Sequence, residues 1–138
     1  MSSGFLLDTC FVIWMSRQEM LAPLSLEMLA ESRVRAIPSY VSTATAWEMA
    51  MLLSKGRIRE TRDVDHWYRD FLRDGGFAEQ PVTARTFMAS CFLPQPIHND
   101  PIDRILIATA RENDLTIITR DRAILSYGAL GHVKVLAC

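Results

Sequence analysis

Residues 98–119, with the sequence HNDPIDRILIATARENDLTIIT, decide the fold that this chain can adopt. Asp100 has the chemistry of a helix N-cap, and Pro101 suits the first helical position because that position needs no backbone N–H. From Ile102 onward, apolar residues recur with the spacing of one helix face. Residues 115–119, LTIIT, then have the composition of a buried strand. The segment therefore predicts a helix that leads into a strand of a buried sheet.

The rest of the chain repeats this alternation of short apolar strands and helices, which favours a mainly parallel sheet with helices on both faces. We expect one three-layer α/β/α domain over residues 1–138, with four to five short strands. The predicted strands cover residues 4–7, 34–37, 77–80, 115–119 and 132–136. The predicted helices begin near residues 11, 23, 43, 64, 81, 101 and 123.

The composition is that of an ordinary globular protein, with 49% apolar and 22% charged residues and a formal net charge of −1. This charge does not indicate nucleic-acid binding by the whole surface, although a local basic groove would be compatible with it. The three cysteines have no metal-binding spacing. Apolar runs are far shorter than the roughly 20 residues of a membrane span. We expect a soluble, cytoplasmic protein.

Three aspartates stand at the predicted ends of these elements. Asp8 ends the first strand, Asp121 follows the strand at 115–119, and Asp103 lies in the first turn of the helix that Asp100 caps. Each has a structural alternative: Asp8 as an N-cap, Asp103 as a charge that stabilises the helix start, and Asp121 as a turn residue. Singly, none of them predicts a site.

Glu48 is the only charged residue between Ala36 and Ser54. It belongs to a helical stripe predicted to face the core, which consists of Ala44, Trp47, Glu48, Met51 and Leu52. A buried carboxylate must be paired, protonated or bound to a metal. An ion pair with an arginine is the structural alternative; we favour a site.

Together these acids predict a metal centre. If the strands before Asp8 and Asp121 are parallel neighbours, both residues emerge at one edge of the sheet, and the helix start with Asp103 can face them. Clustered carboxylates repel one another unless cations neutralise them, and oxygen ligands suit Mg²⁺ or Mn²⁺. Such a centre activates water and stabilises the leaving oxygen in phosphodiester hydrolysis.

The sequence resembles the VapC toxins, PIN-domain ribonucleases of type II (VapBC) toxin–antitoxin systems. The segments that carry the resemblance keep their order and spacing along most of the chain: FLLDT at 5–9, TAWE at 45–48, KGR at 55–57, HNDPIDR at 98–104, IA at 107–108 and TIITRD at 116–121. The resemblance implies a PIN-like fold and an endoribonuclease that depends on Mg²⁺ or Mn²⁺. It implies hydrolysis of structured RNA, such as tRNA or rRNA, that leaves 5′-phosphate and 3′-hydroxyl ends.

The same resemblance implies roles for single residues. The acidic, metal-binding set would be Asp8, Glu48, Asp103 and Asp121, with Asp8 and Asp103 as direct ligands, and Asp100 stays outside it as a helix cap. Hydroxyls of Thr119 and Thr9 would support the set. Basic residues beside it could hold RNA phosphates, with solvated surface charge as the alternative: Arg104, Arg120 and Arg122.

The resemblance also implies partners. A VapB-type antitoxin would cover the toxin and block its acidic site, and a homodimer is expected. Apolar residues on the first two predicted helices could form the antitoxin groove, although core packing would explain them equally well: Trp14, Met15, Met20 and Leu21.

Two other functions compete with this reading. A haloacid-dehalogenase-like phosphatase needs a second aspartate two residues after the strand-end nucleophile, where this chain has Cys10. A catalytically silent interaction module with the PIN fold would be favoured by the loss of one acid, and all four acids are present.

Overall fold

The computed structural model describes residues 4–17 and 21–138. Within them lies one parallel sheet in the order β3-β2-β1-β4-β5. Its strands are β1 (Phe5–Leu7), β2 (Ser39–Ser42), β3 (Ala78–Gln80), β4 (Thr116–Thr119) and β5 (Lys134–Ala137). The predicted parallel sheet of short strands is confirmed.

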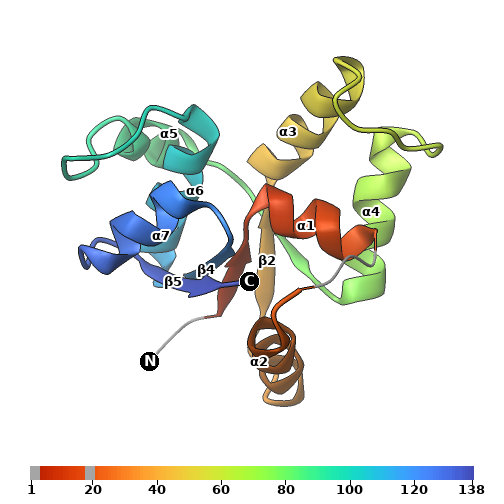
Figure 1. The fold of residues 1–138 in the computed structure, drawn as a ribbon, viewed down its shortest axis with the longest axis horizontal. Helices are drawn as coiled ribbons and strands as arrows, with labels where there is room; N and C mark the ends of the chain where they lie inside the picture. Colours follow the sequence, from red (N-terminus) through yellow and green to blue (C-terminus); the bar gives the residue numbers. More distant parts are fainter. Residues whose placement is uncertain (1–3, 18–20) are drawn as a thin grey trace.

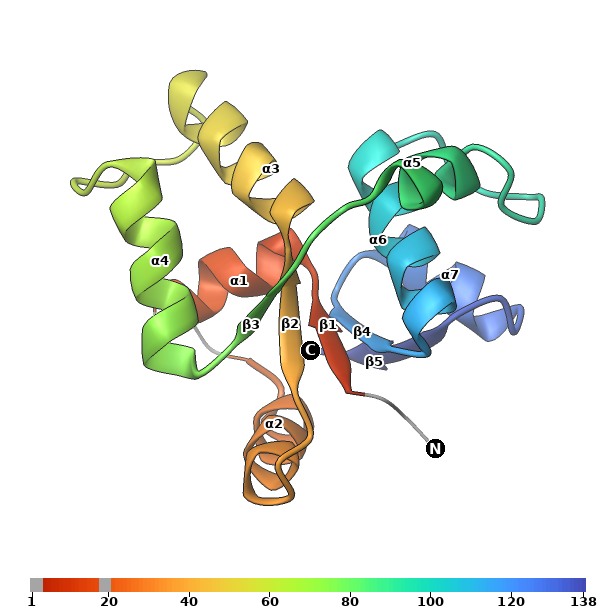
Figure 2. The same cartoon turned by 180° about the vertical axis from the view of Figure 1, so that it is seen from behind.

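Helices flank the sheet on both sides (Figures 1 and 2), which confirms the predicted three-layer α/β/α architecture. In chain order they are α1 (Thr9–Ser16), α2 (Pro23–Val34), α3 (Thr43–Ser54), α4 (Val64–Gly75), α5 (Ala84–Ser90), α6 (Pro101–Asn113) and α7 (Arg122–Ala129). Helix α2 lies beyond the amino end of β2, whereas α3 leaves its carboxyl end. No helix in the described part of the chain is long and apolar enough to cross a membrane.

Strand alternation divides the core between the two faces of the sheet. Phe5, Leu7 and Ile118 pack into one cluster with residues of α1, α2 and α4. Leu6 and Ile117 point the other way, into a second cluster with residues of α6 and α7. Successive side chains of a strand point to opposite faces, so the three apolar residues of β1 and the two of β4 contact both layers.

The strand predicted at residues 34–37 is wrong. Helix α2 continues to Val34, which is exposed, and the strand that pairs with β1 is Ser39–Ser42. Its two serines are buried, because small polar side chains fit a central strand whose backbone groups are already bonded. The Ser42 hydroxyl also accepts a hydrogen bond from Ala44 N at 3.0 Å and so begins α3.

The strand order places a topological switch between β1 and β4. From β1 the chain proceeds outward to β2 and β3, and then crosses back to β4 and β5 on the other side. Leu7 lies opposite Ile118 in register, so both strands end at the same edge. Open α/β sheets bind ligands at the carboxyl ends of such strands.

Candidate metal centre

Asp8 follows β1 directly and is 4% exposed. Its side chain does not cap α1. Instead, Asp8 Oδ2 accepts a hydrogen bond of 2.7 Å from Thr119 Oγ1, at the end of the neighbouring β4. The structural alternative for this residue is therefore excluded, because its carboxylate is held at the junction of the two central strands.

Asp121 does serve as a cap. Its Oδ1 accepts a hydrogen bond of 3.0 Å from Ile124 N and begins α7, and Asp121 N donates to Thr119 Oγ1 at 3.0 Å. Thr119 thus links Asp8 to Asp121. The cap does not remove Asp121 from the cluster, because one of its carboxylate oxygens lies within 4.8 Å of Asp103.

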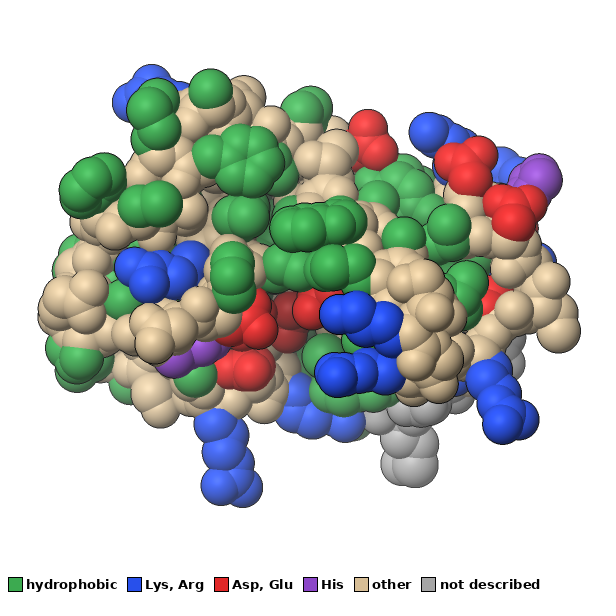
Figure 3. Space-filling view, turned by 90° about the horizontal axis from the view of Figure 1, so that it is seen from above, with side chains coloured by type: hydrophobic (Ala, Val, Ile, Leu, Met, Phe, Trp, Pro, Cys, Tyr) green, Lys and Arg blue, Asp and Glu red, His purple; other side chains and the backbone are tan. Residues whose placement is uncertain are grey.

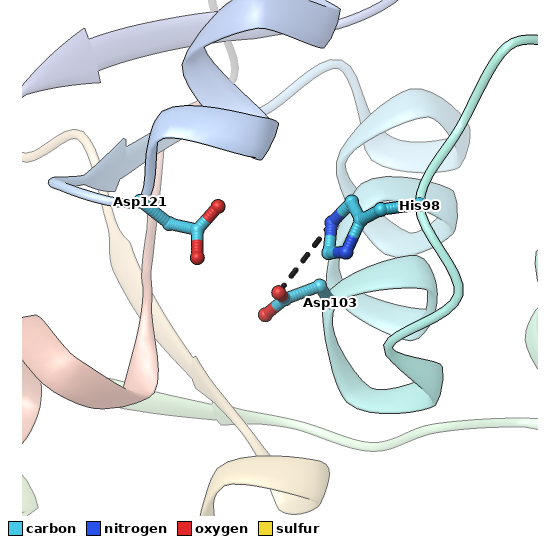
Figure 4. Close-up of side chains that lie close together, drawn as sticks. All are labelled: His98, Asp103 and Asp121. Carbon is cyan, nitrogen blue, oxygen red and sulfur yellow. Dashed lines mark ion pairs between the residues drawn. The ribbon is translucent and has the colours of Figure 1, made fainter.

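Asp100 and Asp103 have separate functions in the first turn of α6. Asp100 Oδ1 accepts a hydrogen bond of 3.0 Å from Asp103 N, as predicted for an N-cap. The side chain of Asp103 is only 15% exposed and points toward Asp121 and His98 (Figure 4). The helix start therefore carries Asp103 to the strand ends.

Glu48 reaches the same region from α3, on a stripe that only partly faces the core: Ala44 is buried, and Met51 and Leu52 pack against core clusters. Trp47 is 55% exposed, and the stripe from Trp47 to Leu52 lines an open groove of about 350 Å³ between α3 and the start of α6. The buried residues of α3 are Ala44, Thr45 and Met49, so the predicted burial of Trp47 is wrong. Glu48 itself is half-buried.

No lysine or arginine of the described chain forms an ion pair with Glu48, which removes its structural alternative. The same holds for Asp8, Asp103 and Asp121; the imidazole Nε2 of His98 lies 3.5 Å from Asp103 Oδ2. Figure 3, a view onto this edge of the molecule, shows acidic side chains grouped near the middle of the face, with apolar and basic side chains around them.

Burial and mutual repulsion raise the pKa values of these acids. Burial raises the pKa of Asp8 to about 6, and the charges of Glu48 and Asp121 add to this effect against the hydrogen bond from Thr119. Burial, with the charges of Asp8 and Asp100, raises the pKa of Asp103 to about 8. Burial also raises the pKa of Glu48, and the Thr9 hydroxyl opposes this increase. The cluster lacks positive charge, which a divalent cation would supply.

The supporting hydroxyls differ in position. Thr119 is fully buried and contacts two of the acids. Thr9 Oγ1 lies 3.0 Å from Thr45 Oγ1, and its hydroxyl also hydrogen-bonds to Glu48. Both hydroxyls therefore orient members of the acidic set.

The three predicted phosphate-binding arginines have different surroundings. Arg104 Nε donates to Ser90 O at 3.1 Å, so its guanidinium is engaged in packing. Arg120 donates two hydrogen bonds to Cys138 O, at 3.1 and 3.0 Å, and lies 4.3 Å from the centre of the Trp14 ring. Arg122 is exposed beside Asp121.

Sequence reasoning missed His98, which is among the first residues of the segment quoted above. His98, Asp103 and Asp121 each offer a ligand atom, and these atoms lie within 4.8 Å of one another (Figure 4). Sequence alone gave no signal for this contact, since His98 belongs to a loop without periodicity, and its position depends on how the loop packs on α7.

Most side chains predicted to form the antitoxin groove pack against the core instead. Trp14, Met15 and Leu21 are partly buried against the cluster that contains Phe11 and Trp67. Met20 lies outside the described residues.

Comparison with known proteins decides the family. The sequence matches the model of the PIN domain over residues 5–130. The chain belongs to the PIN domain family. The family resemblance inferred from the sequence is thus confirmed, and the acids that follow β1 and β4 stand within the matched region.

Individual proteins with similar sequence or fold also match most of the chain. Ribonuclease VapC22 of Mycobacterium tuberculosis is 30% identical over 126 residues, which cover 88% of this chain and 90% of the relative. The PIN fold recurs in the VapBC2 complex of Rickettsia felis, bound to a DNA fragment from its promoter, with a TM-score of 0.69, 14% identity and 98% coverage of both chains. A toxin–antitoxin complex from Klebsiella pneumoniae has a TM-score of 0.58 at 19% identity, with 96% and 95% coverage.

Proposed function

We propose that this PIN-domain protein is a divalent-metal-dependent endoribonuclease and the toxin of a type II toxin–antitoxin pair. One observation carries the proposal: Asp8, Glu48, Asp103 and Asp121 meet at the switch point of the sheet without a lysine or arginine partner in the described chain. Membership of the PIN family and the similarity to a VapC ribonuclease support the same function.

The donor set fits Mg²⁺ or Mn²⁺. Carboxylate oxygens are the ligands that these hard cations prefer. The raised pKa values of Asp8 and Asp103 show that their negative charges are not compensated by nearby positive charge. Asp8 and Asp103 would be the direct ligands, supported by Glu48 and Asp121. When bound, the ion supplies the charge that lowers the pKa of the attacking water and stabilises the leaving 3′ oxygen, which leaves 5′-phosphate and 3′-hydroxyl ends.

The protein itself supplies positioning. Thr119 fixes Asp8 and the turn of Asp121 with two hydrogen bonds, and Asp100 fixes the helix start that carries Asp103. Asp8 and Asp121 are thus held at strand ends and Asp103 at a helix start, and sites that orient reacting groups require such fixed positions. Glu48, with its raised pKa, is suited to accept the proton of the attacking water.

Structured RNA, such as tRNA or rRNA, would approach along the groove on α3. Lys55 and Arg57 line this groove together with Glu48, and exposed Arg122 stands on the other side of the cluster. We propose that these cations hold phosphates on both sides of the scissile bond. Their placement gives the acidic centre a local basic border despite the net charge of −1.

A VapB-type antitoxin is the proposed protein partner, since solved structures with this fold include VapBC2 and another toxin–antitoxin complex. Near the predicted groove, Met15 lines a cleft of about 250 Å³ together with Trp67, Phe71 and Phe77. We propose that the antitoxin inserts an apolar side chain there. A homodimer is also proposed, because α5 exposes Phe87 and Met88, and Phe92 after it is 86% exposed.

RNA cleavage by the purified protein tests the proposed function. We expect tRNA or rRNA to be cut in the presence of Mn²⁺ and left intact with EDTA, and cleavage to stop when the cognate antitoxin is added. If preparations of the wild-type protein and of Asp103→Asn cut at equal rates, the activity is that of a contaminant and the proposal fails.

A further inference from the structure

His98 lies against the acidic centre with its ring nitrogen directed inward. Nε2 is buried and has no hydrogen-bond partner among the described residues, although Asp103 Oδ2 lies 3.5 Å away. A buried polar atom without a partner is uncommon in a folded protein. In Figure 4 the imidazole faces the carboxylates of Asp103 and Asp121.

The loop that carries His98 is anchored, so this orientation is built into the fold. Leu93 and Ile97 pack into the core cluster of α6 and α7, and Tyr127 Oη donates a hydrogen bond of 2.7 Å to Pro94 O. The His98 side chain is 28% exposed. The imidazole is therefore held beside the carboxylates before any ligand binds.

We propose that His98 is a direct metal ligand and that, with Asp103 and Asp121, it forms a mixed nitrogen–oxygen position that prefers a transition-metal ion to Mg²⁺. The inference rests on the proposed function and deepens it, since it assigns a ligand outside the acidic set. The three donor atoms lie within 4.8 Å of one another. Ligands at about 2.1 Å from an octahedral ion are separated by about 3–4.2 Å, so movements of under about 1 Å would complete the geometry.

The chemistry of the donors sets the expected selectivity. Mg²⁺ takes oxygen ligands almost exclusively, whereas a neutral imidazole is a common ligand of transition-metal ions. For one nitrogen-containing site, affinity rises from Mn²⁺ to Co²⁺. We therefore expect affinity to decrease from Co²⁺ to Mn²⁺ to Mg²⁺, with larger differences between the ions than a site of carboxylates alone would show.

Calorimetric titration of the full chain with Mg²⁺, Mn²⁺ and Co²⁺ tests this inference with His98→Gln, which replaces the nitrogen donor by an amide of similar length. His66→Gln is the matched control, because it removes an exposed imidazole on α4. We expect His98→Gln to weaken Mn²⁺ and Co²⁺ binding by about ten-fold or more and Mg²⁺ binding by less than about three-fold. His66→Gln should bind all three ions like the wild type.

Pulsed electron paramagnetic resonance of the Mn²⁺-loaded protein gives an independent readout. We expect modulation from a directly coordinated nitrogen in the wild type and in His66→Gln, and its loss in His98→Gln. Unchanged affinities, an equal loss for all three ions, or a nitrogen signal that survives in His98→Gln would overturn the inference. A second variant, His98→Leu, replaces the imidazole with an apolar side chain and must show the same loss.

Asp103→Asn separates this inference from the proposed function. If Asp103→Asn abolishes metal binding and His98→Gln leaves the order of affinities unchanged, the acidic centre stands and only the role of His98 fails. If Asp103→Asn leaves metal binding intact, the proposed function itself fails.

Discussion

Two regions of this molecule are rich in acids, and they differ in how their charge is neutralised. In the segment from Glu60 to Asp74, which includes most of α4, every acid has a basic partner: Arg62 with Glu60 and Asp70, His66 with Asp63, Arg69 with Asp65, and Arg73 with Asp70 and Asp74. At the carboxyl ends of β1 and β4, the acids have no lysine or arginine partner in the described chain, and one of them, Asp103, lies 3.5 Å from the imidazole of His98.

The pKa values follow this difference. His66 and its backbone lower the pKa of Asp63, and Arg62 lowers the pKa of Glu60, whereas burial and repulsion raise the pKa values of Asp8 and Asp103. Exposed, paired carboxylates contribute little to stability and serve solubility. Buried acids without a lysine or arginine partner destabilise the metal-free fold, which supports the proposed ion site.

The largest expected difference between the two regions is in catalysis. Asp8→Asn keeps the size of the side chain but removes a buried negative charge, and we expect RNA cleavage to fall by about 100- to 1,000-fold because several kcal/mol of transition-state stabilisation are lost. In the same assay, the cleavage rate of Asp65→Asn in α4 should lie within about two-fold of the wild-type rate, because exposed ion pairs contribute little free energy. Equal losses in both variants would remove the distinction.

A smaller effect is expected from the hydroxyl that links Asp8 to Asp121. Thr119→Val leaves Asp8 Oδ2 and Asp121 N without a buried partner, so we expect the free energy of unfolding to fall by about 1–3 kcal/mol and Mn²⁺ affinity to fall as well. Thr109→Val is the control, since among the described residues this buried hydroxyl bonds only to Ile105 O within α6. Denaturant unfolding measures the free energy of unfolding, and Mn²⁺ titration measures the affinity. Mn²⁺ affinities that fall equally in the two variants would contradict this role of Thr119.

The smallest effect is the pH dependence of stability without metal. The pKa values of Asp8 (about 6) and Asp103 (about 8) lie above the value near 4 of an unfolded chain. The folded protein therefore holds more protons than the unfolded chain, and its stability falls as pH rises through this range. The pKa of Asp63 is lowered, so the contribution of that residue is lost as pH falls.

We expect the melting temperature of the metal-free protein to decrease by about 5 °C between pH 5.5 and pH 8.5. Asp103→Asn should remove most of the decrease above pH 7 and should be slightly more stable than the wild type at pH 8. Asp65→Asn should follow the wild-type curve. Thermal unfolding monitored by circular dichroism provides the measurement, and parallel curves for the wild type and Asp103→Asn would show that Asp103 is not repelled by its neighbours.

Much of this arrangement could be predicted because it depends on local signals. Asp8 and Asp121 each follow an apolar strand, and Asp100–Pro101 marks the start of the helix that carries Asp103. Parallel pairing of β1 with β4 then brings the three residues to one edge. Glu48 was found as a lone charge in an apolar helix, although its stripe lines a groove as well as part of the core.

The remaining features depend on tertiary context. The sequence of β2, SYVS, has the polarity of a turn, and only its position beside β1 makes it a strand. His98 reaches Asp103 because Leu93, Ile97 and Tyr127 fix an irregular loop, and no periodic pattern describes such a loop. From the sequence, the apolar residues of α1 were equally compatible with a groove and with the core. In the structure, Trp14 and Met15 are partly buried against the core cluster that contains Trp67.

Thermal unfolding in the presence of metal tests most directly whether the unpaired acids form an ion site. An ion that binds only the folded state stabilises it by about 2.7 kcal/mol at a concentration of 100 Kd. We predict that millimolar Mg²⁺ or Mn²⁺ raises the melting temperature of the wild type and of Asp65→Asn by several degrees, and that of Asp103→Asn far less. A melting temperature of the wild type that is indifferent to both ions up to millimolar concentrations would contradict the central claim.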